Sequence, residues 1–173
     1  MEFIFETKYD QKWISAMAEA LRKTIRKKKS KKQQVLEILI IVFAVILTIP
    51  KKDEEFVITF NLIITLLAVI VMLFVFIFQD KINGYFARKR MITGMEKSIT
   101  TFKEHSYISA TNIGKTEFYY KNILEVVENN DYFIFIFDKS DAQIYDKNGI
   151  TKGNIDEFRR FIAKKTDKEI QKI

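Results

Sequence analysis

Residues 56–78 read FVITFNLIITLLAVIVMLFVFIF, a run of 23 residues without an ionisable side chain. At a rise of about 1.5 Å per residue, a helix of this length covers roughly 34 Å. That exceeds the ~30 Å thickness of the hydrocarbon core of a bilayer. The run therefore predicts a transmembrane helix.

A shorter apolar run, Val35–Ile49, precedes it, and only Pro50–Glu55 separates the two. The shorter run holds 15 residues and includes Glu37. Its helix would cover only about 22 Å, so a buried core helix is an alternative to a span. Lys31 and Lys32 can extend their ammonium groups to the interface and lengthen the effective span. We therefore expect the two runs to form a transmembrane α-helical hairpin.

Basic residues flank this hairpin on one side. Residues 22–32 carry eight Lys or Arg and no acid, whereas Pro50–Glu55 has two lysines against three acids. Basic flanks stay in the cytoplasm, so both termini should be cytoplasmic in a two-pass protein of the cytoplasmic membrane. The first apolar run begins far from Met1 and is not followed by a small-residue cleavage site, so a cleaved signal peptide is not expected.

The net charge of +7 is concentrated beside the membrane, because residues 96–173 hold 13 basic and 13 acidic residues. Near an anionic surface each basic residue contributes about 1 kcal/mol, so lipid headgroups are the expected partner. A topology signal alone is the alternative. Nucleic acid is not expected, since a DNA-binding domain carries its basic surface on the folded domain. The predicted lipid-contacting residues are Arg22, Lys23, Arg26, Lys27, Lys28, Lys29, Lys31, Lys32, Arg88, Lys89 and Arg90.

The residues before the hairpin predict a strand and a helix. Phe3–Thr7 alternates apolar and polar side chains, which is typical of a short strand. Asp10 can cap a helix whose apolar residues recur every four positions from Trp13 to Ile25. We expect this helix to continue through the basic stretch into the first span. Trp13 should anchor it against the strand domain. A second helical extension is expected over Tyr85–Met95.

Residues after the hairpin predict an antiparallel domain. Its strands, separated by turn signals, are Ser98–Lys103, Tyr107–Thr111, Thr116–Tyr120, Ile123–Glu128, Tyr132–Phe137 and Ala142–Tyr145. Tyr132–Phe137 is apolar on both faces and should be a central strand. A closing helix should begin at Asn154. The expected fold is a membrane α-helical hairpin plus an α+β soluble domain, a barrel or sandwich with a C-terminal helix. The N-terminus would contribute its first strand.

The segments Phe118–Ile123, Asp131–Phe137 and Phe158–Phe161, together with the two closely spaced apolar runs, resemble the YcxB-like family of bacterial membrane proteins. The resemblance covers nearly the whole chain and implies a C-terminal domain similar to pleckstrin-homology folds, but no settled activity. Ala142–Lys147 departs from the family pattern because it lacks a proline.

The resemblance and the run boundaries together divide the chain into four parts. They are a strand and basic amphipathic helix (1–34), a transmembrane hairpin (35–49 and 56–78 within 35–78), a juxtamembrane helical connector (79–96) and a pleckstrin-homology-like cytoplasmic domain (97–173).

Residues that carry chemistry are sparse in this sequence. Cysteine is absent and His105 is the only histidine, so a metal site is not expected. No nucleophile or acid–base arrangement is present, and we expect neither an enzyme nor a cofactor. Two intramembrane polar residues stand out. Asn61 should form a hydrogen bond between helices. Glu37 is either an interfacial carboxylate paired with a nearby lysine or a working intramembrane acid.

The sequence therefore predicts a non-enzymatic interaction module that is anchored at the inner leaflet and binds a protein partner or anionic lipid. Assembly into a homo-oligomer is compatible with this prediction. A self-immunity protein, which protects against a membrane-active bacteriocin or toxin, is the alternative from a different class. A gene neighbourhood that contains a secreted toxin would favour that alternative.

Overall fold

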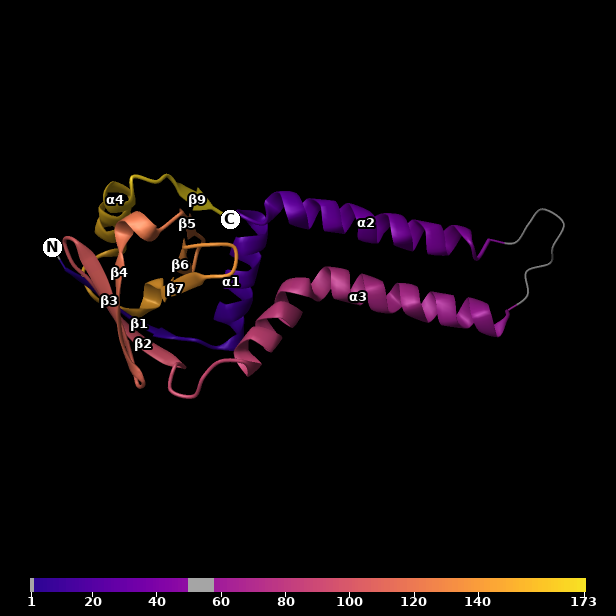
Figure 1. The fold of residues 1–173 in the computed structure, drawn as a ribbon, viewed down its shortest axis with the longest axis horizontal. Coiled ribbons are helices and arrows are strands. Elements are labelled where there is room, and N and C mark those ends of the chain that lie inside the picture. Colours follow the sequence, from indigo (N-terminus) through magenta and orange to yellow (C-terminus); the bar gives the residue numbers. More distant parts are fainter. Residues whose placement is uncertain (1, 50–57) are drawn as a thin grey trace.

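The computed structural model describes residues 2–49 and 58–173, and Figure 1 shows a strand-rich domain from which two long helices project. Within these residues the helices are α1 (Gln11–Lys23), α2 (Lys27–Ile46), α3 (Phe60–Lys89) and α4 (Ile155–Thr166). The strands are β1 (Phe3–Lys8), β2 (Lys97–Phe102), β3 (Ser106–Thr111), β4 (Gly114–Tyr119), β5 (Glu125–Glu128), β6 (Tyr132–Ile136), β7 (Ala142–Asp146), β8 (Ile150–Lys152) and β9 (Ile170–Lys172). The chain is an α+β protein whose C-terminal part is rich in sheet.

Strand β1 joins the N-terminus to a sheet built from the other end of the chain. It pairs antiparallel with β2, from Phe3 opposite Phe102 to Lys8 opposite Lys97. Its other edge pairs with β8, which gives the strand order β4-β3-β2-β1-β8. Phe3 and Phe5 point inward and are fully buried, as the alternating pattern requires. The prediction that the N-terminus contributes the first strand is confirmed.

The second sheet has the order β7-β6-β5-β9, and β6 is buried on both faces. Phe133 and Phe135 belong to the cluster between the two sheets. Ile134 and Ile136 belong to a second cluster on the outer face of β6, where α1 covers the sheet. The prediction of a two-sided central strand is confirmed, because a core lies on each side of β6.

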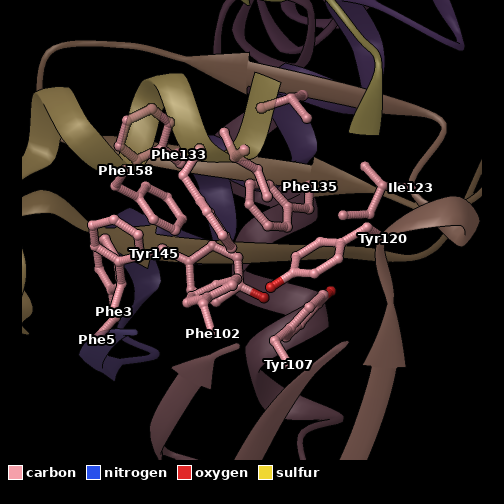
Figure 2. Close-up of a cluster of buried hydrophobic side chains, with 13 residues drawn as sticks. Phe3, Phe5, Phe102, Tyr107, Tyr120, Ile123, Phe133, Phe135, Tyr145 and Phe158 are labelled. Atoms are coloured by element: carbon pink, nitrogen blue, oxygen red, sulfur yellow. The ribbon is translucent and has the colours of Figure 1, made fainter. Parts of the chain in front are cut away.

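Aromatic rings fill the space between the sheets, and Figure 2 shows rings from both sheets meeting α4. Phe158 of α4 lies with its ring centroid 4.6 Å from that of Phe5 and 4.9 Å from that of Phe102. The predicted cap of α4 is present, since the Asn154 side chain accepts a hydrogen bond from the backbone N–H of Asp156 at 2.8 Å. Helix α4 therefore closes the sandwich with an aromatic face.

Helix α1 lies between the second sheet and the two long helices (Figure 1). Asp10 caps it by accepting a hydrogen bond from the backbone N–H of Trp13 at 3.0 Å. The Trp13 ring packs edge-on against Tyr132, with 5.0 Å between centroids. The prediction that Trp13 anchors the helix to the strand domain is confirmed.

The prediction of one continuous helix from α1 into the first apolar run is wrong. The chain breaks at Thr24, with φ −111° and ψ −103°, and Figure 1 shows α2 leaving at a steep angle to α1. The Thr24 hydroxyl donates to the carbonyl of Ala20, a local bond by which threonine competes with the helical ladder. The break lets α1 stay on the sheet while α2 leaves the domain.

The predicted helix over Tyr85–Met95 is correct only in its first half. Helix α3 ends at Lys89, and Ile92–Met95 forms a tight turn in which the N–H of Met95 donates to the carbonyl of Ile92 at 3.1 Å. Gly94 has a φ of +94°, which glycine adopts without strain. Two strands, β8 and β9, were not predicted from the sequence; each has only three residues.

Replacing Phe135 by Ala should lower the free energy of unfolding by about 3–5 kcal/mol, because the fully buried ring would leave a cavity in the aromatic core. Chemical denaturation of the detergent-solubilised chain measures the loss. Tyr119→Ala, on an exposed side chain, is the matched control. A loss below about 1 kcal/mol at Phe135 would contradict the two-sided strand.

Candidate functional site

The first turns of α2 carry the densest positive charge among the described residues. The lysines there are all exposed: Lys27, Lys28, Lys29, Lys31 and Lys32. Successive helical residues point about 100° apart, so these side chains cover directions that span about 200° around the axis. They form a partial collar at the base of α2, which we call the lysine collar.

The lysine collar occupies the end of the helix where positive charge is least favourable. Helix N-termini carry a partial positive charge, and each nearby cation costs roughly 0.3–1 kcal/mol. The first turn of α2 contains no acid, and its N-cap residue Arg26 makes no capping hydrogen bond with its side chain. The positive end of the helix dipole and the lysine side chains therefore raise the electrostatic potential at the same place. An anion bound there would lower the electrostatic free energy.

Three of the predicted lipid-contacting residues form contacts within the protein. The guanidinium of Arg22 donates to the carboxylate of Asp80 on α3, with N–O distances of 2.9 Å from Nε and 2.7 Å from Nη2. Lys23 pairs with Glu19 at 2.7 Å. Arg26 donates from Nε to the carbonyl of Lys139. Arg22 and Arg26 hold α1 and its C-terminal break in place, whereas the pair of Lys23 lies within α1. The collar lysines remain open to an external anion.

The ion pair between Arg22 and Asp80 was not predicted from the sequence. The signal for it was Asp80 itself, the first acid after the second apolar run and within reach of the basic stretch. Both side chains are about three-quarters buried, so the pair is less screened by solvent than a surface pair. It ties the base of α3 to α1 at the junction of domain and helices.

The two long helices run antiparallel and contact each other (Figure 1). Each carries a stripe of side chains with coiled-coil spacing. Side chains on the stripe are less exposed than their neighbours. On α2 and its C-terminal turn they are Ser30, Gln34, Glu37, Ile41, Ala44 and Thr48, and on α3 they are Leu62, Thr65, Val69, Met72 and Phe76. The stripe residues of α2 that lie nearest the domain, Ser30, Gln34 and Glu37, are polar. Beyond Glu37, the other faces of α2 are apolar.

Glu37 therefore faces α3, and its carboxylate accepts a hydrogen bond from the side-chain amide of Gln33 at 2.9 Å. The predicted partner was a lysine, so the structure corrects the partner to Gln33. Asn61 is exposed and lies next to the stripe residue Leu62, off the stripe. The predicted hydrogen bond between Asn61 and another helix stays a prediction. Arg88, Lys89 and Arg90 are exposed at the C-terminal end of α3, where the helix dipole favours cations.

Of the described helices, only α3 is long and apolar enough to cross a membrane. Most of its apolar residues are exposed, so it is not the core helix of the domain. Helix α2 is less apolar, because its 20 residues include the lysine collar and Glu37. The structure thus contains one candidate span where the sequence predicted two. The predicted turn Pro50–Glu55 lies outside the described residues.

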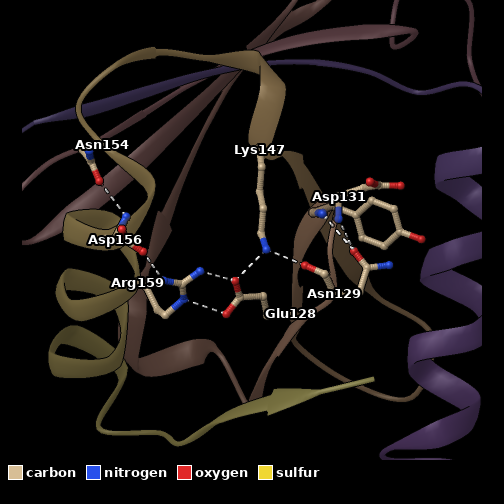
Figure 3. A network of polar contacts seen from close by, with 8 residues as sticks. Glu128, Asn129, Asp131, Lys147, Asn154, Asp156 and Arg159 are labelled. Carbon is tan, nitrogen blue, oxygen red and sulfur yellow. Dashed lines mark hydrogen bonds and ion pairs between the residues drawn. The ribbon is translucent and has the colours of Figure 1, made fainter.

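A second polar cluster lies away from the long helices and joins β5, the short turn after β7 and α4 (Figure 3). Both oxygens of the buried Glu128 accept from Arg159, at 2.9 and 2.6 Å, and one also accepts from Lys147 at 2.6 Å. Lys147 also donates to the carbonyl of Asn129. Because Glu128 is buried and both of its oxygens accept hydrogen bonds from cationic side chains of other elements, this cluster braces the fold.

Comparison with known families matches the strand-rich part of the chain. Residues 102–162 match the family model described as YcxB-like protein. The match runs from the last residue of β2 into α4 and does not include the long helices. Searches of curated proteins and of solved structures found no match. The family match therefore supports the resemblance for residues 102–162. Evidence on membrane association comes from the long helices alone.

Replacing Glu128 by Gln should reduce stability by about 1–3 kcal/mol at pH 7. Burial raises the pKa of Glu128, but hydrogen bonds from Arg159 and Lys147 outweigh it and lower the pKa below its ordinary value. A lowered pKa stabilises the fold above the unfolded-state value of about 4.3, and this contribution is lost as the pH falls further.

Unfolding free energies at pH 7, 5 and 3.5 measure this effect. The difference between parent and Glu128→Gln should shrink at the lowest pH, while Glu169→Gln, at an exposed position, stays near the parent throughout. A difference that does not change with pH would contradict the ionised brace.

Proposed function

We propose that this chain is a non-enzymatic interaction module anchored in the bacterial cytoplasmic membrane by two spans. The observation that carries the proposal is the pairing of β1 with β2, since these strands precede and follow the long helices. Two strands of one sheet lie on the same side of a membrane. The chain between them must cross the bilayer an even number of times, and α3 is a candidate crossing.

Helix α2 and the residues after it are the natural partner crossing. Its apolar part covers only about 22 Å over residues 35–49, which is short for a span. Two features reduce the mismatch. The collar lysines can reach toward the headgroups, and the polar side chains Gln34 and Glu37 face α3, away from lipid.

The charges set the orientation in this proposal. The lysine collar lies at the domain end of α2, and Arg88–Arg90 lies at the domain end of α3. Basic flanks stay cytoplasmic, so the strand-rich domain and both termini lie inside the cell. Two packed sheets closed by α4 support a pleckstrin-homology-like domain, and the match to the YcxB-like family covers this part.

Anionic lipid is the proposed ligand of the lysine collar. The collar is exposed, opposes the dipole of α2 and lies where the helix would enter the headgroup layer. Within the described residues, no ion pair inside the protein neutralises it. The strand domain, held at the inner leaflet, would then present its outer surface to a cytoplasmic partner.

Replacing Lys27, Lys28, Lys29 and Lys31 by Gln should remove up to about 4 kcal/mol of preference for anionic lipid at low salt. The full chain is purified from membranes that contain phosphatidylglycerol and phosphatidylcholine, and the ratio of the two bound lipids is measured. Added salt should lower the ratio for the parent, because the attraction is screened over roughly 8–10 Å.

A control variant carries the same four charge losses on the strand domain, at the exposed Lys103, Lys121, Lys164 and Lys168. It should keep the lipid ratio of the parent. If the collar variant also keeps that ratio, the collar is a topology signal and does not bind lipid.

A further inference from the structure

Strand β4 is the longest strand at a sheet edge among the described residues. It ends the first sheet, and its six residues, Gly114–Tyr119, pair with β3 on one side only. The strand at the other edge of that sheet, β8, has three residues. An edge strand carries a row of unpaired backbone N–H and C=O groups and is a template for a further strand. Strand β4 therefore offers backbone hydrogen bonds to a partner strand along its whole length.

The β3–β4 hairpin determines which backbone groups of β4 point to the open edge. Thr111 and Gly114 flank a two-residue turn and lie opposite each other. The residues that flank such a turn exchange the first hydrogen bonds of the ladder, and hydrogen-bonded pairs then alternate with non-hydrogen-bonded pairs. The N–H and C=O groups of Lys115 and Glu117 therefore point away from β3 and are available to a second strand.

The charges of β4 are complementary to themselves around Thr116. If two copies of β4 pair antiparallel with Thr116 at the centre, Lys115 of each copy lies opposite Glu117 of the other. Opposite charges at such positions stabilise a sheet. Both side chains are exposed, and in the part of the chain that the structure describes neither forms an ion pair. A second copy would supply both partners at once.

Charge also separates this register from its neighbours. Pairing centred on Lys115 places two lysines opposite each other, and pairing centred on Glu117 places two glutamates opposite each other. Like charges directly opposite destabilise a sheet. A lysine on an edge strand ordinarily hinders the addition of another strand. Glu117 of a second copy removes that hindrance, whereas a strand of another protein needs an acid at the matching position.

The same register brings Phe118 of one copy opposite Gly114 of the other. A Cβ on Gly114 would meet no atom within 4 Å, so the space beside this glycine is open. The glycines with a positive φ are Gly94 and Gly153, so the backbone at Gly114 does not require a glycine. An aromatic side chain across from an edge glycine covers its exposed backbone. Gly114 thus leaves room for the aromatic ring of a second copy.

The order of the layers allows two copies to share one membrane. Figure 1 shows the first sheet, the second sheet, α1 and the long helices following one another in one direction. The two-fold axis between two antiparallel strands is perpendicular to their sheet, so it runs along this direction. The long helices of both copies then project from the same side of the dimer. This step alone relies on the proposed membrane anchoring.

We propose that a second copy of this chain binds at the open edge of β4 and joins the two first sheets into one, with the two-fold axis at Thr116. The interface is isologous, because the same strand contributes to it from both copies. Backbone hydrogen bonds supply the contact, as in other cases of strand addition, and the pairs between Lys115 and Glu117 set the register. The inference goes beyond the proposed function by naming the chain itself as a partner.

Thr116→Cys tests the contact, since the chain contains no cysteine. Residues opposite each other in a non-hydrogen-bonded pair have Cα atoms about 4.5 Å apart, which lies within the range of a disulfide. Oxidation of membranes that contain the full-length variant should convert most of it to a disulfide-linked dimer. The matched control is Thr151→Cys, an exposed threonine on β8 at the other edge of the same sheet, and it should stay monomeric.

Charge variants in the Thr116→Cys background distinguish the proposed register from random collision. Lys115→Glu places glutamates opposite each other at both positions and should lower the initial rate of cross-linking at least about tenfold. The double variant Lys115→Glu/Glu117→Lys restores opposite charges and should restore the rate. Lys121→Glu, at an exposed lysine beyond the strand, should keep the parent rate. Melting temperatures equal to that of the parent will show that the variants fold.

Equal cross-linking of Thr116→Cys and Thr151→Cys, or none in either, would overturn the inference. A double charge variant that cross-links no faster than Lys115→Glu would do the same. A disulfide from Thr116→Cys to a different protein in place of the dimer would overturn it in favour of another partner strand. Failure of the proposed function gives a different result. A chain recovered outside the membrane fraction contradicts anchoring, whereas a membrane-bound chain without the dimer contradicts only the pairing of β4.

Discussion

The pairing of β1 with β2 is the constraint on which the rest of the molecule depends. It joins Phe3–Lys8 to Lys97–Phe102 across the whole length of both strands. Everything between them, α1 and both long helices, is an insertion whose two ends meet at one sheet. A single apolar helix in such an insertion cannot be a single crossing. If the candidate span α3 crosses a membrane, the pairing of β1 with β2 therefore requires a second crossing between these strands.

Three sets of contacts hold the junction between the domain and the long helices. Arg22 and Asp80 connect α1 to α3 through a bidentate pair that is mostly buried. One further turn along α3, Gly84 lets the helices touch, since a Cβ there would lie 2.2 Å from the Ser15 hydroxyl. Trp13 and its neighbours seat α1 on the second sheet. Helix α1 therefore sets the angle between the strand-rich domain and the long helices.

Much of the domain was predictable because its patterns are local. The strands from β1 to β7, the two-sided β6 and the cap of α4 all follow from alternation, turn residues and an N-cap asparagine. Strands β8 and β9 are too short to show a period, and they exist because β1 and β5 offer free edges. The break at Thr24 lies inside the apolar pattern that runs from Trp13 to Ile25, where no glycine or proline marks a helix end.

The candidate sites were less predictable than the fold. The exposed lysines of the collar were found by charge alone, but the partners of Arg22 and Arg26 come from α3 and the β6–β7 turn, far away in the sequence. The contact of Ile113 with Gly94 joins the β3–β4 hairpin to the turn before β2, two segments that no local pattern connects. Only the fold places Ile113 on Gly94 and Lys97 opposite Lys8.

Disulfide trapping in membranes tests the pairing of β1 with β2 most directly, since the chain contains no cysteine. Glu6→Cys/Ile99→Cys joins a cross-strand pair, and the control Glu6→Cys/Lys115→Cys joins residues three strands apart. Oxidation of membranes that contain the full chain should cross-link the first pair nearly completely within one molecule and leave the control reduced. Equal cross-linking of both, or none in the first pair, would contradict the account.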